Sequence, residues 1–499
     1  MRERLTLSSY FLFLLLCAFG CGDSQVLDTV WNGEDPVPPT LNEIKEEEQP
    51  PLKPNPQVKF HKAPKPLHPD AITNDWPSFL GPTHDAKSTE TKLLKKWPEG
   101  GPSLVWEMET GTGYSSPAIQ GEHLVYIHRL ENEEIVECLH PESGEQYWSY
   151  SYPSQYQDRY GYNNGPRASP IIEGDRVYTY GAGGMLHCLH LPTGQIYWSR
   201  DLSTEFKLKQ DFFGVTCTPL IEGNLLIINI GAPGGPCVGA FDKDTGKLIW
   251  GKGNEWGPSY GSPVPGVVHG QRRVMVFAGG DSSPPVGGLL VVNPVDGSIE
   301  TRFPWRSQSY ESVNAACPTV FENNVFVSAS YEIGGALVKL LPEGGHEVLW
   351  ETKELETHFN TTVYKDGFLY GFDGRNQADG SLVCLEAGTG KLMWRETRRW
   401  KETTVFRGKE QEAERGILRG TLLWADGHFL CLGELGHLLW LDLSPGGYNE
   451  ISRAKLFEAS ETWCLPVLSH GLLYISQNTR SIDGTKPTRL LCYDLRGAE

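Results

Sequence analysis

Aromatic, amide and charged side chains gather in short segments that come just before runs of strand-forming residues. Trp256 and Tyr260 precede Ser262-Pro263-Val264, and Trp463 precedes the run at Leu465. Such mixtures suit a polar ring ligand, a sugar or an extended peptide, because flat rings supply contact area while amides and charges fix orientation. The candidate binding residues of this kind are Tyr114, Arg159, Tyr162, Asn164, Arg167, Trp256, Tyr260, Glu311, Asn314, His358 and Trp463.

The same residues also have a purely structural interpretation. They would plug a channel and satisfy one another's hydrogen bonds, and Arg159 and Arg167 would pair with Asp158 or Glu255. The sequence leaves both interpretations open. No motif among these residues places a catalytic base, and no His/Cys set has zinc-site spacing, so we predict neither catalytic residues nor a metal site.

A repeated phrase that ends in an aromatic residue indicates which elements position these segments. Its clearest copy is Asp244-Thr245-Gly246-Lys247-Leu248-Ile249-Trp250, and the copies recur at roughly 44 to 53 residues, a period typical of repeated β units. Each unit contains a Pro-led strand, a Gly, Asn or Asp turn, two further strands and a fourth strand with the aromatic residue. We expect the following tryptophans to fill joints between neighbouring units: Trp106, Trp148, Trp198, Trp250, Trp350 and Trp394.

The number of units predicts an all-β, eight-bladed β-propeller made of four-stranded antiparallel blades. First strands begin near Ser116, Ser169, Thr218, Ser262, Cys317, Thr361, Thr421 and Leu465. The eighth unit ends after three strands, and residues 103–108 upstream of the first blade can supply the fourth. Such closure joins the two chain ends and leaves no open blade edge. A seven-bladed ring is the alternative, and the one helical turn that the sequence suggests is at 411–415.

The first 75 residues predict export and attachment. Residues 1–21 form a signal peptide whose end, Ala18-Phe19-Gly20-Cys21, resembles a bacterial lipobox, so Cys21 would carry the lipid. An ordinary signal peptide cut near Cys21 is the alternative. Residues 22–75 are rich in Pro, Glu and Lys and predict a disordered tether that reaches about 150 Å. The propeller then occupies residues 76–499.

The net charge indicates which partners are disfavoured, and the positions of the cysteines indicate whether disulfides are expected. The formal net charge of −18 disfavours nucleic acid as a partner. Nine of the eleven cysteines lie outside the export segment, and most of them occupy equivalent strand positions of different units, such as Cys138, Cys188 and Cys384. Equivalent positions lie far apart around a ring, so these cysteines are expected to be buried apolar fillers and not disulfides.

The Thr-Gly-x-x-x-Trp repeat resembles the tryptophan-docking motif of pyrroloquinoline-quinone (PQQ) propeller proteins over about residues 76–497. That superfamily contains quinoprotein dehydrogenases and non-catalytic relatives such as BamB, a lipoprotein of the outer-membrane β-barrel assembly machinery. The phrase Asp75-Trp76-Pro77-Ser78-Phe79-Leu80-Gly81-Pro82 also looks like the entry segment of exported PQQ-like repeat proteins of planctomycete-type bacteria.

The resemblance implies what an enzyme of this class would need. Its PQQ ring lies between a Trp and a disulfide of adjacent cysteines, with Ca²⁺ held by Glu and Asn and an Asp as base. Glu311 and Asn314 occupy a suitable loop, but the chain has no adjacent Cys-Cys pair and no C-x-x-C-H haem motif. We therefore predict no cofactor.

We expect a non-catalytic, envelope-anchored module that binds an envelope protein or a small polar ligand at the channel mouth. The alternative is a PQQ- and Ca²⁺-dependent oxidoreductase acting on small alcohols or sugars. A third possibility is a carbohydrate-binding module that uses Trp256, Tyr260 and Trp463.

Overall fold

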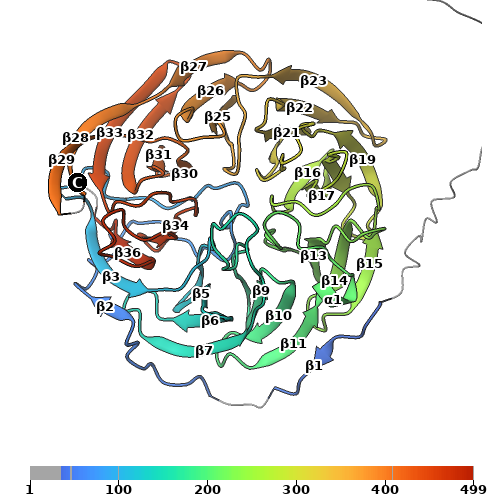
Figure 1. Cartoon of the computed structure of the whole chain (residues 1–499), viewed down its shortest axis with the longest axis horizontal. Coiled ribbons are helices and arrows are strands. Elements are labelled where there is room, and N and C mark those ends of the chain that lie inside the picture. Colours follow the sequence, from blue (N-terminus) through green and yellow to red (C-terminus); the bar gives the residue numbers. More distant parts are fainter. Residues whose placement is uncertain (1–34, 45–47, 99, 407, 498–499) are drawn as a thin grey trace, which may run out of the picture.

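Eight four-stranded antiparallel sheets stand side by side around a central axis (Figure 1). The computed structural model describes residues 35–44, 48–98, 100–406 and 408–497. Within seven of the sheets the four blade strands follow one another in chain order from the axis outward, as four short segments joined by tight turns would. The prediction of an all-β, eight-bladed propeller is confirmed, and the seven-bladed alternative is wrong.

The first four blades follow the repeat without interruption. Blade 1 contains β4 (Ala118–Gln120), β5 (His123–Leu130), β6 (Glu133–Leu139) and β7 (Gln146–Pro153). Blade 2 contains β8 (Ile171–Glu173), β9 (Arg176–Tyr180), β10 (Met185–His190) and β11 (Ile196–Asp201). Blade 3 contains β12 (Leu220–Glu222), β13 (Leu225–Asn229), β14 (Val238–Asp242) and β15 (Leu248–Lys252). Blade 4 contains β16 (Val264–Val268), β17 (Gln271–Ala278), β18 (Gly288–Val292) and β19 (Ile299–Pro304).

The last four blades include the seventh unit, which lacks the terminal Trp. Blade 5 contains β20 (Thr319–Phe321), β21 (Asn324–Ala329), β22 (Gly334–Leu340) and β23 (His346–Thr352). Blade 6 contains β24 (Val363–Lys365), β25 (Phe368–Asp373), β26 (Ser381–Glu386) and β27 (Leu392–Glu396). Blade 7 contains β30 (Thr421–Ala425), β31 (His428–Leu432), β32 (His437–Ser444) and β33 (Gly447–Lys455). Blade 8 contains β34 (Val467–Ser469), β35 (Leu472–Gln477), β36 (Arg489–Asp494) and β3 (Ser103–Glu109).

Both ends of the propeller meet in blade 8. Strand β3 pairs antiparallel with β36, with Trp106 opposite Cys492 and Met108 opposite Leu490. The N-terminal strand therefore supplies the fourth strand that the last unit lacks. The prediction that residues 103–108 close the ring is confirmed.

Two elements differ from the sequence-based expectation. Residues 411–415 are not helical: they lie in β29 (Lys409–Gly416), which pairs along its length with β28 (Arg399–Phe406), so cross-strand pairing replaces the expected turn of helix. The single helix of the described residues is α1 (Leu202–Glu205), where the Asp201 side chain caps the N-terminus by accepting from Thr204 N. Among these residues no helix is long and apolar enough to cross a membrane.

The described part of the expected tether, residues 35–44 and 48–75, runs along the outside of the ring (Figure 1). We call it the belt. Its strand β1 (Thr40–Leu41) pairs with β11, Lys53 forms a bridge to Gln146 in blade 1, and β2 (Val58–Phe60) pairs with β3. An outer strand offers unpaired N–H and C=O groups, and an extended segment satisfies them. The expectation of a disordered tether is therefore wrong for these residues, whereas residues 1–34, which include the expected signal peptide and Cys21, lie outside the described part of the chain.

The repeat tryptophans lie in the joints between blades. Each indole Nε1 donates to a backbone carbonyl of the turn before the fourth strand of the next blade, as Trp198 does to Lys243 O at 3.0 Å. The Gly of the repeated phrase lies on that indole: a Cβ on Gly246 would come within 2.6 Å of the Trp198 ring, and its φ of +71° also favours Gly. The other pairs are Trp106 with Pro141 (2.8 Å), Trp148 with Leu191 (2.7 Å), Trp250 with Pro294 (3.0 Å), Trp350 with Ala387 (3.0 Å) and Trp394 with Ser444 (2.7 Å).

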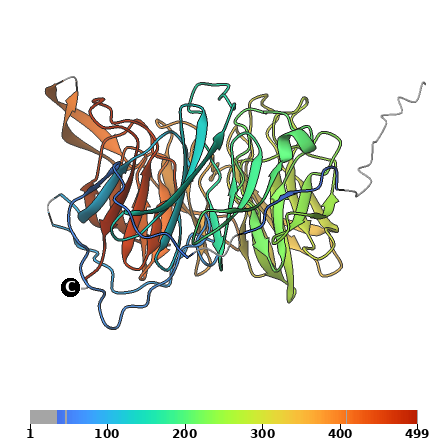
Figure 2. The ribbon, with the colours of Figure 1, turned by 90° about the horizontal axis from the view of Figure 1, so that it is seen from below.

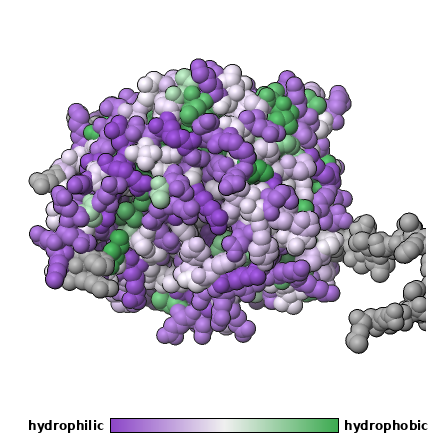
Figure 3. All heavy atoms as spheres, turned by 45° about the horizontal axis from the view of Figure 1, so that its top comes forward, coloured by the Kyte–Doolittle hydropathy of each residue, from purple (hydrophilic) through white to green (hydrophobic). Residues whose placement is uncertain are grey.

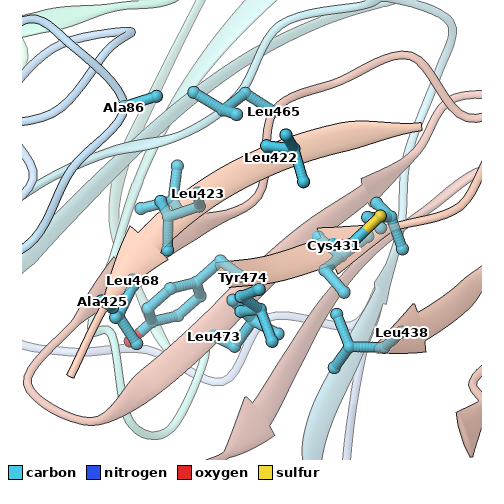
Figure 4. Close-up of a cluster of buried hydrophobic side chains, with 14 of the residues drawn as sticks. Ala86, Leu422, Leu423, Ala425, Cys431, Leu438, Leu465, Leu468, Leu473 and Tyr474 are labelled. Carbon is cyan, nitrogen blue, oxygen red and sulfur yellow. The ribbon is translucent and has the colours of Figure 1, made fainter. Parts of the chain in front are cut away.

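Apolar residues fill the space between blades. The largest cluster spans the closing seam of blades 7 and 8, where Leu423, Cys431 and Tyr474 are almost fully buried (Figure 4). All nine cysteines of the described residues are buried free thiols, so the expectation of apolar fillers is confirmed for them.

Candidate functional site

A cavity of about 670 Å³ opens at the mouth of the central channel. Loops before the first strands of the eight blades contribute to its wall, which places the cavity on the axis of the ring. Seven of the candidate residues line it: Tyr114, Tyr162, Arg167, Tyr260, Glu311, His358 and Trp463.

The other four candidates lie elsewhere. Arg159 pairs with Asp281 at 3.0 Å on the surface, and Asn164 Oδ1 accepts from Asp158 N at 2.7 Å. Trp256 packs against the apolar cluster between blades 3 and 4. Asn314 is fully buried, and its Nδ2 donates to Ala278 O and Trp305 O at 2.9 and 3.0 Å.

A carboxylate at the centre of the loop before blade 2 holds that loop in shape. The Asp158 side chain is completely buried; its Oδ1 accepts from the backbone N of Tyr160 and Tyr162 at 2.9 and 3.1 Å. Its Oδ2 accepts from Arg167 Nη2 at 2.6 Å, so the expected pairing of Arg167 with Asp158 is confirmed. The loop is thereby fixed while Tyr160 and Tyr162 stay 42% and 51% exposed at the cavity wall.

Arg167 also supports the aromatic wall. Its guanidinium carbon lies 5.2 Å from the ring centroid of Tyr114 and 5.9 Å from that of Phe213. A cation over a ring face is attracted by the electrons of the ring, so this arginine holds neighbouring rings while its charge is balanced by Asp158. The arginine thus has structural partners and contributes its apolar and planar surfaces to the cavity.

Trp463 is fixed in the same aromatic wall. Tyr114 stacks on it with ring centroids 5.5 Å apart and planes at 15°, and Phe359 lies 4.8 Å away. Its Nε1 donates to Glu434 at 2.9 Å, and the same carboxylate accepts from Arg419 at 2.5 Å. These contacts already occupy much of the indole, which reduces its use as a sugar platform.

Burial shifts the pKa of several titratable groups in the wall, among them His358 and Glu461. Burial, with a smaller effect from Arg419 and Arg375, lowers the pKa of His358 to about 3, so this imidazole is neutral at ordinary pH. Burial, together with the nearby Glu434, raises the pKa of the Glu461 carboxyl. Tyr114 donates its hydroxyl to Glu461 at 3.2 Å. Both groups are therefore engaged by the protein.

Some lining residues were missed by the analysis of strand entries. Tyr331 and Arg375 come from loops that follow the second strands of blades 5 and 6, and Phe79 comes from the segment before β3. The Arg375 guanidinium lies 4.3 Å from the Tyr331 ring centroid, and no carboxylate of the described residues pairs with it. The common offset of Tyr331 and Arg375 within their repeats is the signal that could have revealed them.

The residues present do not fit the PQQ arrangement that the fold class implies. Cys317 and Cys464 line the cavity as separate free thiols, and Asn314 uses its amide for backbone carbonyls behind the wall, apart from Glu311. Within the described residues no group of three or more His, Cys, Asp or Glu side chains could hold a metal ion.

The ring, its docking tryptophans and the axial cavity define a PQQ-like β-propeller of the BamB and quinoprotein superfamily. The chain belongs to the family described as outer membrane protein assembly factor BamB, whose model matches residues 131–396 and 237–496. No curated protein is significantly similar to the sequence.

Solved structures share the fold at low sequence identity. A europium-containing methanol dehydrogenase is 11% identical with a TM-score of 0.55, covering 84% of this chain and 98% of its own. Quinohemoprotein alcohol dehydrogenase from Comamonas testosteroni is 11% identical with a TM-score of 0.56, covering 85% and 81%. BamB from Moraxella catarrhalis is 13% identical with a TM-score of 0.48, covering 80% and 98%. At these identities the two dehydrogenases show the common fold alone.

Proposed function

We propose that this protein is a non-catalytic, envelope-anchored propeller that binds a protein segment or a small polar ligand at its channel mouth. The cavity of about 670 Å³ carries this proposal, because its wall combines fixed aromatic rings with exposed polar groups. Tyr160 and Tyr162 stand partly exposed on a loop that Asp158 has already ordered. A rigid aromatic surface loses little conformational entropy when it binds.

A binding role suits the protonation chemistry of the wall better than catalysis does. His358 is neutral and donates to or accepts from Tyr331 through Nε2 at 3.1 Å, while Glu461 is hydrogen-bonded to Tyr114. A general base needs a pKa near the working pH and access to the reacting proton. We infer that neither group serves as one, and that the cavity does not hold PQQ.

The belt limits how far the propeller can lie from its proposed anchor. Arg200, whose side chain is fully buried, pairs with Asp35, and Asp35 also accepts from Leu248 N at 2.9 Å. If Cys21 carries lipid, only residues 22–34 separate the anchor from this fixed point. Thirteen residues reach about 45 Å at most, so the propeller would stay close to the membrane surface. An envelope protein, as the family description indicates, is the partner class that this position favours.

A crosslinking experiment tests the binding role. A photo-reactive phenylalanine analogue replaces Tyr162 in the full chain expressed in its native cells, and the control carries it at Val295, which is 79% exposed and distant from the mouth. We expect a discrete adduct from Tyr162 only, weakened by Arg375→Glu. Equal adducts from both positions, or none from Tyr162, would contradict the proposal.

A thermal-shift titration tests the cofactor statement. Saturating PQQ with Ca²⁺ should leave the Tm unchanged, because a ligand stabilises only the state that binds it. A rise of several degrees that Trp463→Ala abolishes would favour the oxidoreductase alternative instead.

A further inference from the structure

One β-hairpin of the described chain belongs to no blade. Strands β28 and β29 lie between the last strand of blade 6 and the first strand of blade 7, and they pair only with each other. Figure 2 shows this hairpin standing out from the body of the ring. Since all eight blades are complete without it, ring closure does not explain its presence.

The base of the hairpin is held firmly against blade 7. Glu402 accepts from His437 Nε2 at 2.9 Å and pairs with Lys455 at 2.9 Å, while Arg415 pairs with Glu458. Lys455 also pairs with Glu458 at 2.7 Å. A network of partly buried ion pairs fixes geometry better than one exposed pair does. The hairpin is therefore presented in one orientation.

The outer edge of β29 is free and borders a second cavity. Among the described residues β29 pairs with β28 alone, so its other edge offers unpaired backbone N–H and C=O groups. Next to it lies a cavity of about 470 Å³, lined by residues 414–416 of β29 and, across from them, Ser460 and Ile482. Gln377 and Ala378 line both this cavity and the one at the channel mouth, so the two are neighbours.

The exposed face of β29 indicates the charge of its occupant. Glu410, Glu412 and Glu414 alternate along the strand, so all three side chains share one face, and all are exposed. A second copy of β29 would place glutamates against glutamates, which disfavours self-pairing. Basic side chains at alternate positions would instead meet these carboxylates, of which Glu412 also lies 3.6 Å from Lys401 Nζ of β28 in an exposed pair. The face of the molecule seen in Figure 3 is largely hydrophilic with small apolar areas, which suits recognition through backbone pairing and charge.

We propose that β29 accepts, as a third strand, an extended polypeptide segment that carries Lys or Arg at alternate positions. Backbone hydrogen bonds to the free edge supply the affinity, and pairing with the three glutamates sets register and specificity. The adjoining cavities let the same segment continue over Gln377 and Ala378 toward the mouth. The inference names the partner class of the proposed function and rests on that proposal for the partner's identity.

Peptide binding to the full chain tests the strand-addition site. The probe is a fluorescent, end-blocked peptide of four Lys-Val repeats, and the variant is Glu410→Lys/Glu412→Lys/Glu414→Lys. The matched control, Glu343→Lys/Glu347→Lys/Glu351→Lys, makes the same charge change on exposed residues in and beside β23 of blade 5. We expect about tenfold weaker binding to the hairpin variant and less than about twofold weaker binding to the control. Equal losses in both variants would show unspecific attraction and overturn the proposal.

Two further measurements separate strand addition from simple charge attraction and from the mouth site. Binding of the peptide should slow hydrogen exchange at residues 409–416 of the protein. N-methylation of alternate peptide amides should abolish both the binding and this protection. Unchanged binding of the methylated peptide would overturn strand addition. If Tyr162 gives no crosslink but the peptide still binds, the proposed binding role of the mouth is wrong and the hairpin site stands. If Tyr162 gives the crosslink but the peptide does not bind, the hairpin site is wrong and the role of the mouth stands.

Discussion

The joints between blades and the loops at the channel mouth follow opposite rules. At six joints the same contact recurs: an indole Nε1 donates to a turn carbonyl of the next blade. At the mouth each blade contributes a different residue, such as Tyr114, His358 or Trp463. The joint must bury two large sheet faces with one geometry, so its residues are constrained by packing. The mouth has no such shared requirement, which leaves it free to be shaped by a ligand.

Removal of one docking indole should give the largest loss of stability among the variants considered. Trp198 is fully buried between blades 2 and 3, so Trp198→Ala is expected to lower the free energy of unfolding by about 3–5 kcal/mol. Denaturant unfolding at constant pH measures this. Trp198→Phe is the matched control, because it keeps a ring in the joint while losing the bond to Lys243 O, and it should cost clearly less. A loss under about 1 kcal/mol for Trp198→Ala would remove the distinction between joints and mouth.

The same distinction explains what the sequence could predict. Gly246 and Trp250 recur because a positive φ, a close contact and a large ring are needed at six of the eight joints, so the blade count and the closing strand β3 could be predicted from the repeat. The belt could not be foreseen, because its pairing depends on which outer edges remain open after the ring has closed. Proline-rich composition describes an extended chain equally well when it is free and when it lies along a strand.

The mouth was predicted only in part for a related reason. Tyr162 and Trp463 were found because they precede first strands, whereas Arg375 was missed because it follows a second strand. Asn314 has the same sequence position relative to its blade as other lining residues, yet its amide turns inward to backbone carbonyls. Loop conformation, which the repeat does not specify, decides which side chain reaches the cavity.

A fall in pH should destabilise the fold through one buried histidine at a blade joint and another at the channel mouth. Burial lowers the pKa of His187, between blades 1 and 2, to about 4, and that of His358 at the mouth to about 3. The unfolded chain takes up these protons near pH 6.5, so the stability that neutral imidazole contributes is present above pH 6.5 and is lost as pH falls toward 4. For His187 the loss is on the order of 3 kcal/mol.

Comparison of His187→Phe with the wild type separates the contribution of this imidazole from those of other groups that titrate in the same pH range. Burial raises the pKa of Glu90 to about 7, which has the opposite sign, because stability from its neutral form is lost as pH rises through 7. We therefore expect His187→Phe to become more stable relative to the wild type between pH 6.5 and 4, measured by unfolding at several pH values. His358→Phe is the parallel variant for the mouth. A pH-independent difference for both would contradict the proposed protonation states.

The next largest loss of stability is expected in the loop that presents Tyr160 and Tyr162. Asp158→Asn keeps the shape of the side chain but removes the charge that balances Arg167, and its amide cannot accept all four donors. A loss of about 1–3 kcal/mol is expected, with faster hydrogen exchange at residues 156–165. Asp281→Asn serves as control, since it removes the charge that pairs with Arg159 at the surface and leaves the contacts of Asp158 in place. Unchanged exchange in Asp158→Asn would mean that the loop is held by other contacts.

The smallest effect on stability should accompany a large effect on binding. Tyr162 is 51% exposed and touches Trp463 and Phe213 only through ring contacts, so Tyr162→Ala should change the free energy of unfolding by less than about 0.5 kcal/mol. A binding residue at an ordered mouth differs from a docking Trp in this respect, since its ring gains its main contacts from the ligand. Affinity for the crosslinked partner, measured with purified proteins, should fall about tenfold or more. If Tyr162→Ala instead destabilised the fold as Trp198→Ala is expected to do, the mouth rings would act as channel filling, and the structural interpretation of these residues would replace the binding one.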